Sequence, residues 1–354
     1  MLHRKEVLNF MPDYILSFLI ALVIAYLLTP QIISLAKKAG AMDAPDERKV
    51  HTAPIPRMGG LAIYVAFMVA VFFTVDLTTE ITGLLVGGTI ILIVGVIDDL
   101  KNLPAKVKLV GQILAALVLV MFDIRIDWVS DPFGDMIYLE YLAVPVTLFW
   151  IVGLTNTVNL IDGLDGLAAG VSTIASITIL LVALQQNYIL IAVLTAAIAG
   201  GALGFLQYNF NPAKIFMGDT GSMFLGYMLA GISVIGAVKS AATIALIVPI
   251  FALGLPILDT TFAIVRRYMS GKPIFKPDRG HLHHRLLDLG FTQKQAVLLM
   301  YVISGVLGLS AIAVTEVSSG FAIIIIVAVM LVVFLGARKL GILKTKKSVG
   351  TNTN

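Results

Sequence analysis

Five aspartates interrupt long apolar runs of this 354-residue sequence: Asp98, Asp99, Asp162, Asp165 and Asp219. A charged group in apolar surroundings is costly unless it is paired or serves a function. Adjacent carboxylates such as Asp98 and Asp99 repel each other, so at least one of them attracts a cation or shares a proton. The pattern favours chemistry on an anionic substrate. For this pair alone, a helix end balanced by the three lysines of residues 101–108 is the structural alternative.

A polar string, NTVNLIDGLDG, occupies residues 156–166. If it is a helix end followed by a turn, Asn159, Asp162 and, less regularly, Asp165 fall on one face, because they are spaced by three residues. Amide and carboxylate oxygens suit Mg²⁺, which takes few protein carboxylates and completes its shell with water and phosphate oxygens. A polar turn that caps the next helix is the alternative.

A third string, FMGDTGS at residues 216–222, precedes another apolar run. Small residues around an acid at the start of a helix form a nest of backbone N–H groups suited to phosphate, and Asp219 could hold a metal ion beside it. Alone, the string also fits an ordinary N-cap formed by Asp219 or Ser222. Its occurrence together with the other acidic segments favours a functional site.

A basic segment, residues 266–294, holds seven of the 25 Lys and Arg residues. It also contains three of the five histidines, namely His281, His283 and His284. Nearby Arg279 and Arg285 would repel a metal ion, so a clamp on a diphosphate fits better than a metal site. Arginine offers a bidentate fork, and a protonated imidazole adds charge. A basic loop that lies on anionic lipid headgroups is the alternative.

A second basic segment, residues 49–60, is stiffened by prolines and leads into an apolar run. His51 and Arg57 are candidate phosphate contacts within it. Membrane orientation alone would also account for its charges.

Membrane-spanning helices are the elements that must position these residues. The chain is 58% hydrophobic and only 13% charged, with a mean hydropathy of +0.97, whereas a soluble domain carries about 25% charge. A span takes roughly 20 apolar residues. Such runs lie near residues 13–36, 60–77, 81–98, 107–123, 141–158, 165–184, 187–206, 220–238, 242–266, 296–314 and 319–337. We therefore predict an all-α polytopic membrane protein with about eleven transmembrane helices, forming a single domain over residues 1–354. The absence of cysteine excludes disulfides, thiol nucleophiles and thiolate metal sites.

The distribution of positive charge predicts the orientation. The pI of about 9.1 raises the question of nucleic-acid binding, but the basic residues sit in short gaps between apolar runs, where they set topology instead. With the N-terminus outside, 21 of the 25 Lys and Arg residues fall on the cytosolic side. This predicted topology places the C-terminus, the basic loop 266–294 and the active site on the cytosolic face. Residues 123–141 become an external hairpin loop, with Ile124–Val129 pairing with Met136–Tyr141.

The strings PRMGG, DDLKN, NTVNLIDGLDG, FMGDTGS and HLHHR, in this order, resemble those of the polyprenyl-phosphate N-acetylhexosamine-1-phosphate transferase family. The resemblance covers roughly residues 45–290. It implies that Asp98 and Asp99 lie at the lipid-phosphate and diphosphate end of a cleft, and that Asn159 and Asp219 hold Mg²⁺, with Mn²⁺ as an alternative. It further implies that Phe216 stacks on uracil and that Asp162 and Asp165 shape the nucleotide pocket. The remaining substrate contacts that it implies are Asn209, Lys108, His281, His283, His284 and Arg285.

The resemblance also implies the reaction. N-acetylglucosamine-1-phosphate passes from UDP-N-acetylglucosamine to undecaprenyl phosphate, UMP leaves, and the lipid-linked sugar starts a cell-envelope glycopolymer at the bacterial plasma membrane. HLHHR is similar to the N-acetylglucosamine branch, whereas the muramoyl-pentapeptide branch, the alternative, carries a triple-histidine string.

Two further questions stay open at this point. Direct attack with Asp98 as base and a two-step route through an aspartyl-phosphate both fit, and we prefer the direct route. A monomer and a homodimer are equally compatible with the sequence. An ion-coupled transporter is disfavoured, because transporters place acids near the bilayer midplane and only Asp259 lies inside a predicted span.

Overall fold

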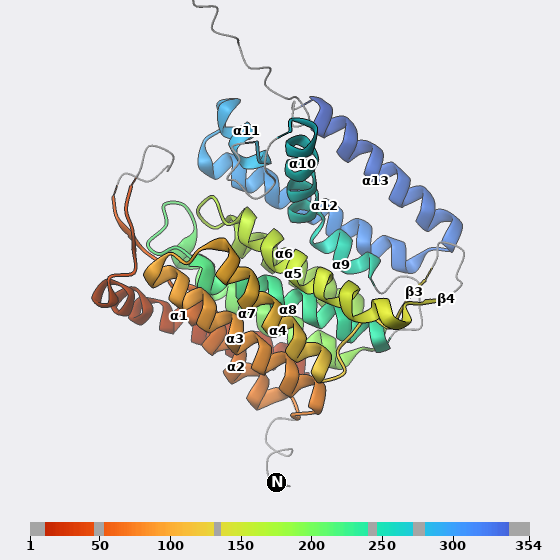
Figure 1. Ribbon diagram of the computed structural model, residues 1–354, viewed down its shortest axis with the longest axis horizontal. Helices are drawn as coiled ribbons and strands as arrows, with labels where there is room; N and C mark the ends of the chain where they lie inside the picture. The colour runs from red at the N-terminus through yellow and green to blue at the C-terminus, as the bar shows by residue number, and fades with distance from the viewer. Residues whose placement is uncertain (1–10, 46–52, 131–135, 240–245, 272–279, 340–354) are drawn as a thin grey trace, which may run out of the picture.

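The computed structural model describes residues 11–45, 53–130, 136–239, 246–271 and 280–339. Helices dominate this part of the chain. They are α1 (Asp13–Ala39), α2 (Gly60–Thr74), α3 (Thr79–Lys101), α4 (Ala105–Met121), α5 (Ala143–Ile161), α6 (Leu167–Gln185), α7 (Ile189–Asn209), α8 (Gly218–Lys239), α9 (Ile247–Ala252), α10 (Gly254–Met269), α11 (Leu282–Asp288), α12 (Gln293–Glu316) and α13 (Ser319–Lys339). Helices α1–α8 form one layered bundle, and α9–α13 gather along one edge of it (Figure 1).

The predicted fold class, an all-α polytopic membrane protein, is confirmed. Eight of the described helices are long and apolar enough to cross a bilayer, namely α1, α3, α5 (extended at its start by the short 3-10 helix η2, Glu140–Leu142), α6, α7, α8, α12 and α13. Helix α2, with 15 residues, is apolar but shorter. The count of eleven spans and the orientation stay predictions.

Helix α8 forms the centre of the bundle. It packs against α3 on one side and α5 on another, and 94% of its window Gly218–Ala237 is buried. By contrast, only 11% of the corresponding window of α13 is buried, as expected of a helix that faces lipid. The N-terminal end of α8 therefore has a position fixed by the core of the protein.

The predicted ninth span, residues 242–266, is not one continuous helix. In its described part the chain forms α9 and then α10, with Leu253 between them, and the chain changes direction at this point (Figure 1). Proline 256 lacks the N–H that would bond to the carbonyl of Ala252, so the helical ladder is interrupted there. The apolar run predicted a helix correctly but did not reveal the break.

Two small hairpins complete the fold. Strands β3 (Trp128–Ser130) and β4 (Met136–Tyr138) pair antiparallel, so the predicted hairpin is present with shorter strands. It follows the C-terminal end of α4. Strands β1 (Met42–Asp43) and β2 (Ile55–Pro56), which were not predicted, also pair antiparallel and flank residues that lie outside the described part.

Candidate active site

The acidic strings meet at the ends of helices. Asp98 and Asp99 end α3, and Asp219 begins α8; each offers one carboxylate oxygen within 4.8 Å of the others. Lys108, in the first turn of α4, lies between two of them, with its Nζ 2.7 Å from Asp219 Oδ2 and 3.4 Å from Asp98 Oδ2. The lysine thus offsets part of the repulsion between the carboxylates.

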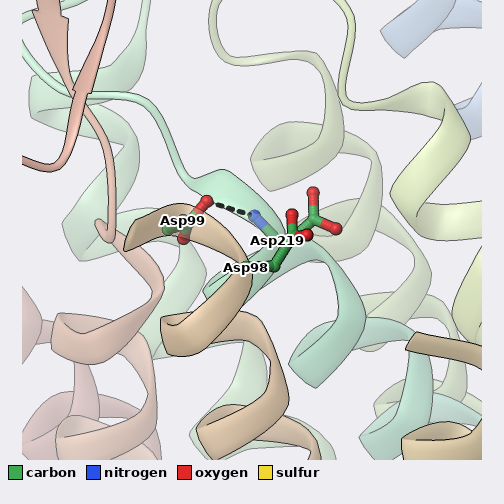
Figure 2. Close-up of side chains that lie close together, drawn as sticks. All are labelled: Asp98, Asp99 and Asp219. Atoms are coloured by element: carbon green, nitrogen blue, oxygen red, sulfur yellow. Dashed lines mark hydrogen bonds between the residues drawn. The ribbon is translucent and has the colours of Figure 1, made fainter. Parts of the chain in front are cut away.

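The two adjacent aspartates do different things (Figure 2). Asp99 reaches across to α8 and accepts hydrogen bonds from the backbone N–H groups of Asp219 and Thr220, at 3.1 Å each, and from the Thr220 hydroxyl. It therefore caps α8 from another helix, where a negative charge complements the helix dipole. Gly218 permits this approach, because it has a φ of 71° and a Cβ there would overlap the Asp99 carboxylate.

Asp98 points to the other side of the helix end. Its Oδ1 accepts the N–H of Leu103 at 2.7 Å, and its Oδ2 faces Lys108. Figure 2 shows its carboxyl group beside that of Asp219. Successive residues of a helix differ in direction by about 100°, which explains the division of roles.

A cavity of about 300 Å³ opens beside this cluster, a size typical of ligand pockets. Many predicted site residues line it, namely Arg57, Asp99, Asn159, Asp162, Asp165, Asn209, Phe216, Asp219 and His284. They come from segments as far apart in sequence as the loop before α2 and helix α11. Asp98, Lys108, His281, His283 and Arg285 are not among its lining residues.

The NTVNLIDGLDG string forms the end of α5 and the turn to α6. Asn159 donates from Nδ2 to Ser222 Oγ at 2.8 Å, which ties α5 to the first turn of α8. Burial, together with the nearby carboxylates of Asp219, Asp99 and Asp165, raises the pKa of Asp162 to about 8. A cation or a cationic group in the cavity would reverse this effect.

The loop between α7 and α8 closes another side of the cavity. Asp165 Oδ2 accepts from Asn211 Nδ2 and from the backbone N–H of Ala213, both at 3.0 Å, so it holds this loop in place. Asn209 donates from Nδ2 to the carbonyl of Ile215 at 2.9 Å. Its buried Oδ1 has no hydrogen-bond partner among the described residues, and so it is available to a ligand.

Arg57 lies at the edge of the cavity beside an acid that sequence reasoning missed. Its Nε is 3.3 Å from Asp43 Oδ1, and it donates to the side chain of Asn102, just after α3. Asp43 and Gln293 also line the cavity. Neither belongs to a polar string within an apolar run, so no local signal marked them. His51 lies outside the described residues.

The histidines stand in a column that leads to the cavity. The rings of His281 and His283 are stacked at 5.7 Å with an interplanar angle of 6°, and the ring of His284 lies 4.2 Å from that of His283. Burial and the neighbouring His284 lower the pKa of His283 to about 3. A lowered pKa favours the neutral form of this imidazole, because burial excludes water from it. The diphosphate clamp expected of this segment stays a prediction.

Comparison with known proteins identifies the family. The model of glycosyl transferase family 4 matches residues 81–237. The chain is 41% identical over 334 residues, 94% of its length and 93% of the relative's, to a Bacillus subtilis protein named probable undecaprenyl-phosphate N-acetylglucosaminyl 1-phosphate transferase. A decaprenyl-phosphate N-acetylglucosaminephosphotransferase of Mycobacterium tuberculosis is 38% identical over 324 residues, 83% of this chain and 80% of that protein.

A more distant relative belongs to the muramoyl branch. The phospho-N-acetylmuramoyl-pentapeptide-transferase of Caldanaerobacter subterraneus is 32% identical over 308 residues, 82% of this chain and 93% of that protein. Matches of this extent cover the helices and the cavity together, and the family expected from the five strings is confirmed. The chain belongs to glycosyl transferase family 4.

Proposed function

We propose that this protein transfers N-acetylglucosamine-1-phosphate from UDP-N-acetylglucosamine to undecaprenyl phosphate, with release of UMP. One observation carries the proposal: the 41% identity to a protein named for this reaction extends over 94% of the chain. The muramoyl-pentapeptide enzyme matches less well, at 32% over 82% of the chain. The HLHHR string points to the same sugar.

The nucleotide end of the donor fits the part of the cavity lined by Phe216, Asn209 and Asp165. Phe216 offers a flat apolar face for the uracil ring. The Asn209 Oδ1 that lacks a partner in the described structure accepts a hydrogen bond from a uracil N–H. His284 and Arg57, on other parts of the lining, face the diphosphate and the sugar.

The acidic side of the cavity suits Mg²⁺. Asp219 and Asn159 both line it and offer a carboxylate and an amide oxygen, the donor set that Mg²⁺ takes alongside phosphate oxygens. Asn159 donates to Ser222 from Nδ2, so that hydrogen bond does not use its Oδ1, the atom that would bind the ion. When bound, the ion would neutralise charge that develops on the donor diphosphate. We assign Asp219 and Asn159 as its protein ligands, with Mn²⁺ as a substitute.

The transfer itself is a displacement at phosphorus. An oxygen of the lipid phosphate forms a bond to the phosphorus that carries the sugar, the bond from this phosphorus to the bridging oxygen breaks, and UMP leaves with the electron pair. Lys108, held by Asp98 and Asp219, brings positive charge to the place where the two anions meet. Asp98 removes a proton from the lipid phosphate when that group arrives protonated.

We place this site at the cytosolic face of a bacterial plasma membrane, because most Lys and Arg residues lie on that side of the predicted topology. The chain has no cysteine, so single cysteines can be placed at two exposed positions, Tyr138 and Asp288. A thiol reagent that does not cross membranes should label Tyr138→Cys in intact cells and Asp288→Cys only after lysis. Labelling of both variants in intact cells would contradict this orientation.

Purified protein tests the reaction. It should transfer radiolabel from UDP-N-acetylglucosamine to undecaprenyl phosphate in the presence of Mg²⁺, release UMP, and stop when the metal is chelated. UDP-N-acetylmuramoyl-pentapeptide, given in parallel, should leave the lipid unlabelled. Labelling from the muramoyl donor alone would replace the proposed sugar, and labelling from neither donor would reject the proposed reaction.

A further inference from the structure

An acid in helix α10 takes no part in the chemistry described so far. Asp259 lies in the middle of α10, and its side chain is only 4% exposed. A buried carboxylate is costly unless nearby groups hydrogen-bond to it. The contacts that satisfy Asp259 therefore indicate what it holds in place.

Both oxygens of Asp259 bind residues that follow it by more than twenty positions. Oδ2 lies 2.9 Å from Nδ1 of His281, and Oδ1 accepts the backbone N–H of Leu282 at 2.7 Å. A carboxylate oxygen accepts hydrogen bonds, so we assign Nδ1 of His281 as the donor in this contact. The second contact fixes the start of α11, because Leu282 is its first residue. A single side chain thus sets both the orientation of the His281 ring and the start of this helix.

The same side of α10 holds this segment at a second point. Arg266 lies seven residues, or two turns, after Asp259 and is also buried. Gly280 packs on its guanidinium group so closely that a Cβ there would overlap it. The three residues Gly280 to Leu282 are therefore held between a buried acid and a buried base on one helix.

The His281 ring continues toward the cavity through the histidine column. His281 stacks on His283, whose ring is next to that of His284, and His284 lines the cavity. His283 also packs on the turn after α5: a Cβ on Gly163 would lie 2.7 Å from its Nε2. A displacement at Asp259 would consequently be transmitted through three packed rings to the cavity wall.

We propose that Asp259 is a positioning residue for donor binding: through its bonds to His281 and to the N–H of Leu282, it holds the histidine column so that His284 faces the UDP-sugar. The inference rests on the proposed function. Asp259 does not contact the substrate. Carboxylates that hydrogen-bond to metal-binding histidines have the same effect, because they fix the orientation and the tautomer of the imidazole ring.

The first test compares Asp259→Asn with a matched control, Thr195→Val. Thr195 is also buried, but in the described part of the chain its hydroxyl bonds to carbonyls of its own helix, α7, and to no other element. We expect Asp259→Asn to lower kcat/KM by roughly 10–100-fold, mainly through a higher KM for UDP-N-acetylglucosamine, with an unchanged KM for the lipid. Thr195→Val should behave as wild type. Loss of kcat with both KM values unchanged would overturn the proposal, because it indicates a structural role only.

A second measurement does not depend on turnover. In Asp259→Asn the side-chain carbonyl oxygen would accept the hydrogen bond from the N–H of Leu282. The amide NH₂ group would then face His281. Because this group is a donor, Nδ1 of His281 would have to accept and the ring proton would have to sit on Nε2. Nitrogen-15 NMR of histidine-labelled protein should show a protonated Nδ1 for His281 in the wild type and an unprotonated one in the variant, with the signal assigned from His281→Gln. An unchanged His281 signal would also overturn the proposal.

Asp259→Glu covers the case in which Asp259→Asn does not fold. It keeps the charge but moves the carboxylate outward by one methylene, so we again expect a raised KM for the donor, and a wild-type KM would count against the proposal. The failure of the proposed function would look different. In that case the wild-type protein would not turn over UDP-N-acetylglucosamine at all, while the NMR result would still report on the Asp259–His281 contact.

Discussion

The two sides of the cavity are built in different ways. The acidic side, formed by Asp99, Asn159, Asp162 and Asp219, comes from the ends of α3, α5 and α8, and α3 and α5 each pack against α8 in the core. The histidine column, formed by His281, His283 and His284, lies at the start of the short helix α11 at the edge of the bundle and is anchored on α10. The acidic side cannot shift without repacking the core, whereas the column can change through a few local contacts.

This difference suggests how the two sides divide the work. The chemistry at phosphorus needs a fixed arrangement of charges, which helices crossing the core supply. Recognition of a particular sugar can vary through a peripheral segment that leaves the core untouched. Substitutions on the acidic side should therefore affect turnover or stability, and substitutions around the column should affect donor affinity.

The largest effect is expected at Asp219. Asp219→Asn should reduce transfer to background, a loss of at least about 10²–10³-fold, because a proposed metal ligand and one of the two acidic partners of Lys108 are lost together. Titration with Mg²⁺ should show weaker binding, while the melting temperature in detergent stays near that of the wild type. Asp127→Asn, which changes an exposed acid paired with Arg125, is the matched control. An active variant with an unaltered Mg²⁺ requirement would rule out the assignment.

Asp98 should show the next largest effect. If it removes a proton from the lipid phosphate, Asp98→Asn should lower kcat by about 10²–10⁴-fold and leave the affinity for UDP-N-acetylglucosamine close to normal. The acid limb of the pH profile should also disappear, because the titrating group is gone. Substantial turnover with an unaltered profile would instead make Asp98 a residue that only holds Lys108.

Asp99 tests the other half of the acidic side. Asp99→Ala leaves the N–H groups of Asp219 and Thr220 and the Thr220 hydroxyl without their acceptor. We expect a destabilisation of about 3 kcal/mol, seen as a lower melting temperature in detergent, because unsatisfied buried donors are costly. Asp99→Asn should lose less stability, since its side-chain carbonyl still accepts a hydrogen bond from these donors. Equal melting temperatures for wild type and Asp99→Ala would show that the cap is dispensable.

Gly163 tests the packing of the column against the turn after α5. A Cβ in Gly163→Ala must push against His283, so we expect KM for the UDP-sugar to rise by roughly tenfold, as for a disturbed supporting residue, with little change in kcat. Gly153→Ala is the control, because a Cβ there meets nothing within 4 Å. An equal KM in both variants would mean that the column tolerates displacement.

The smallest effect concerns pH. Between its ordinary pKa of 3.8 and its folded value of about 8, Asp162 is ionised in the unfolded chain but protonated in the folded one, so stability falls as pH rises through this window. Asp162→Asn removes this pH-dependent loss of stability, because the amide does not ionise. We compare the melting temperatures of the variant and the wild type without substrate or metal. The difference in favour of the variant should be roughly 2–4 °C larger at about pH 8 than at about pH 5. The carboxyl opens onto the cavity, which keeps the effect modest. A difference in melting temperature that is the same at both pH values would contradict the raised pKa of Asp162.

Much of the fold followed from local patterns in the sequence. Long apolar runs predicted the helices, because only a helix satisfies its own backbone hydrogen bonds in lipid. The hairpin at β3 and β4 followed from alternating residues around a turn. The break between α9 and α10 did not follow, because prolines also occur in kinked but continuous spans, and neighbouring packing decides between the two outcomes.

The candidate site was predicted unevenly. Polar strings within apolar runs identified Asp98, Asp162 and Asp219, because a charge in such a place is costly wherever the chain folds. Asp43 and Gln293 were missed, since residues in polar segments carry no such signal. Asp259 carried the signal, as an acid inside an apolar helix, but the sequence did not indicate His281 as its partner.

The sequence by itself thus determined the class of protein, the family and the polar strings that carry chemistry, because apolar length and the cost of buried charge are properties of short segments. Only the tertiary structure decided what each residue of a string does. Asp99 caps a helix that begins 119 residues later, at Gly218, while Asp98 faces Lys108. Such contacts depend on which helix ends meet, and the packing of α3, α5 and α8 around a shared core fixes that meeting.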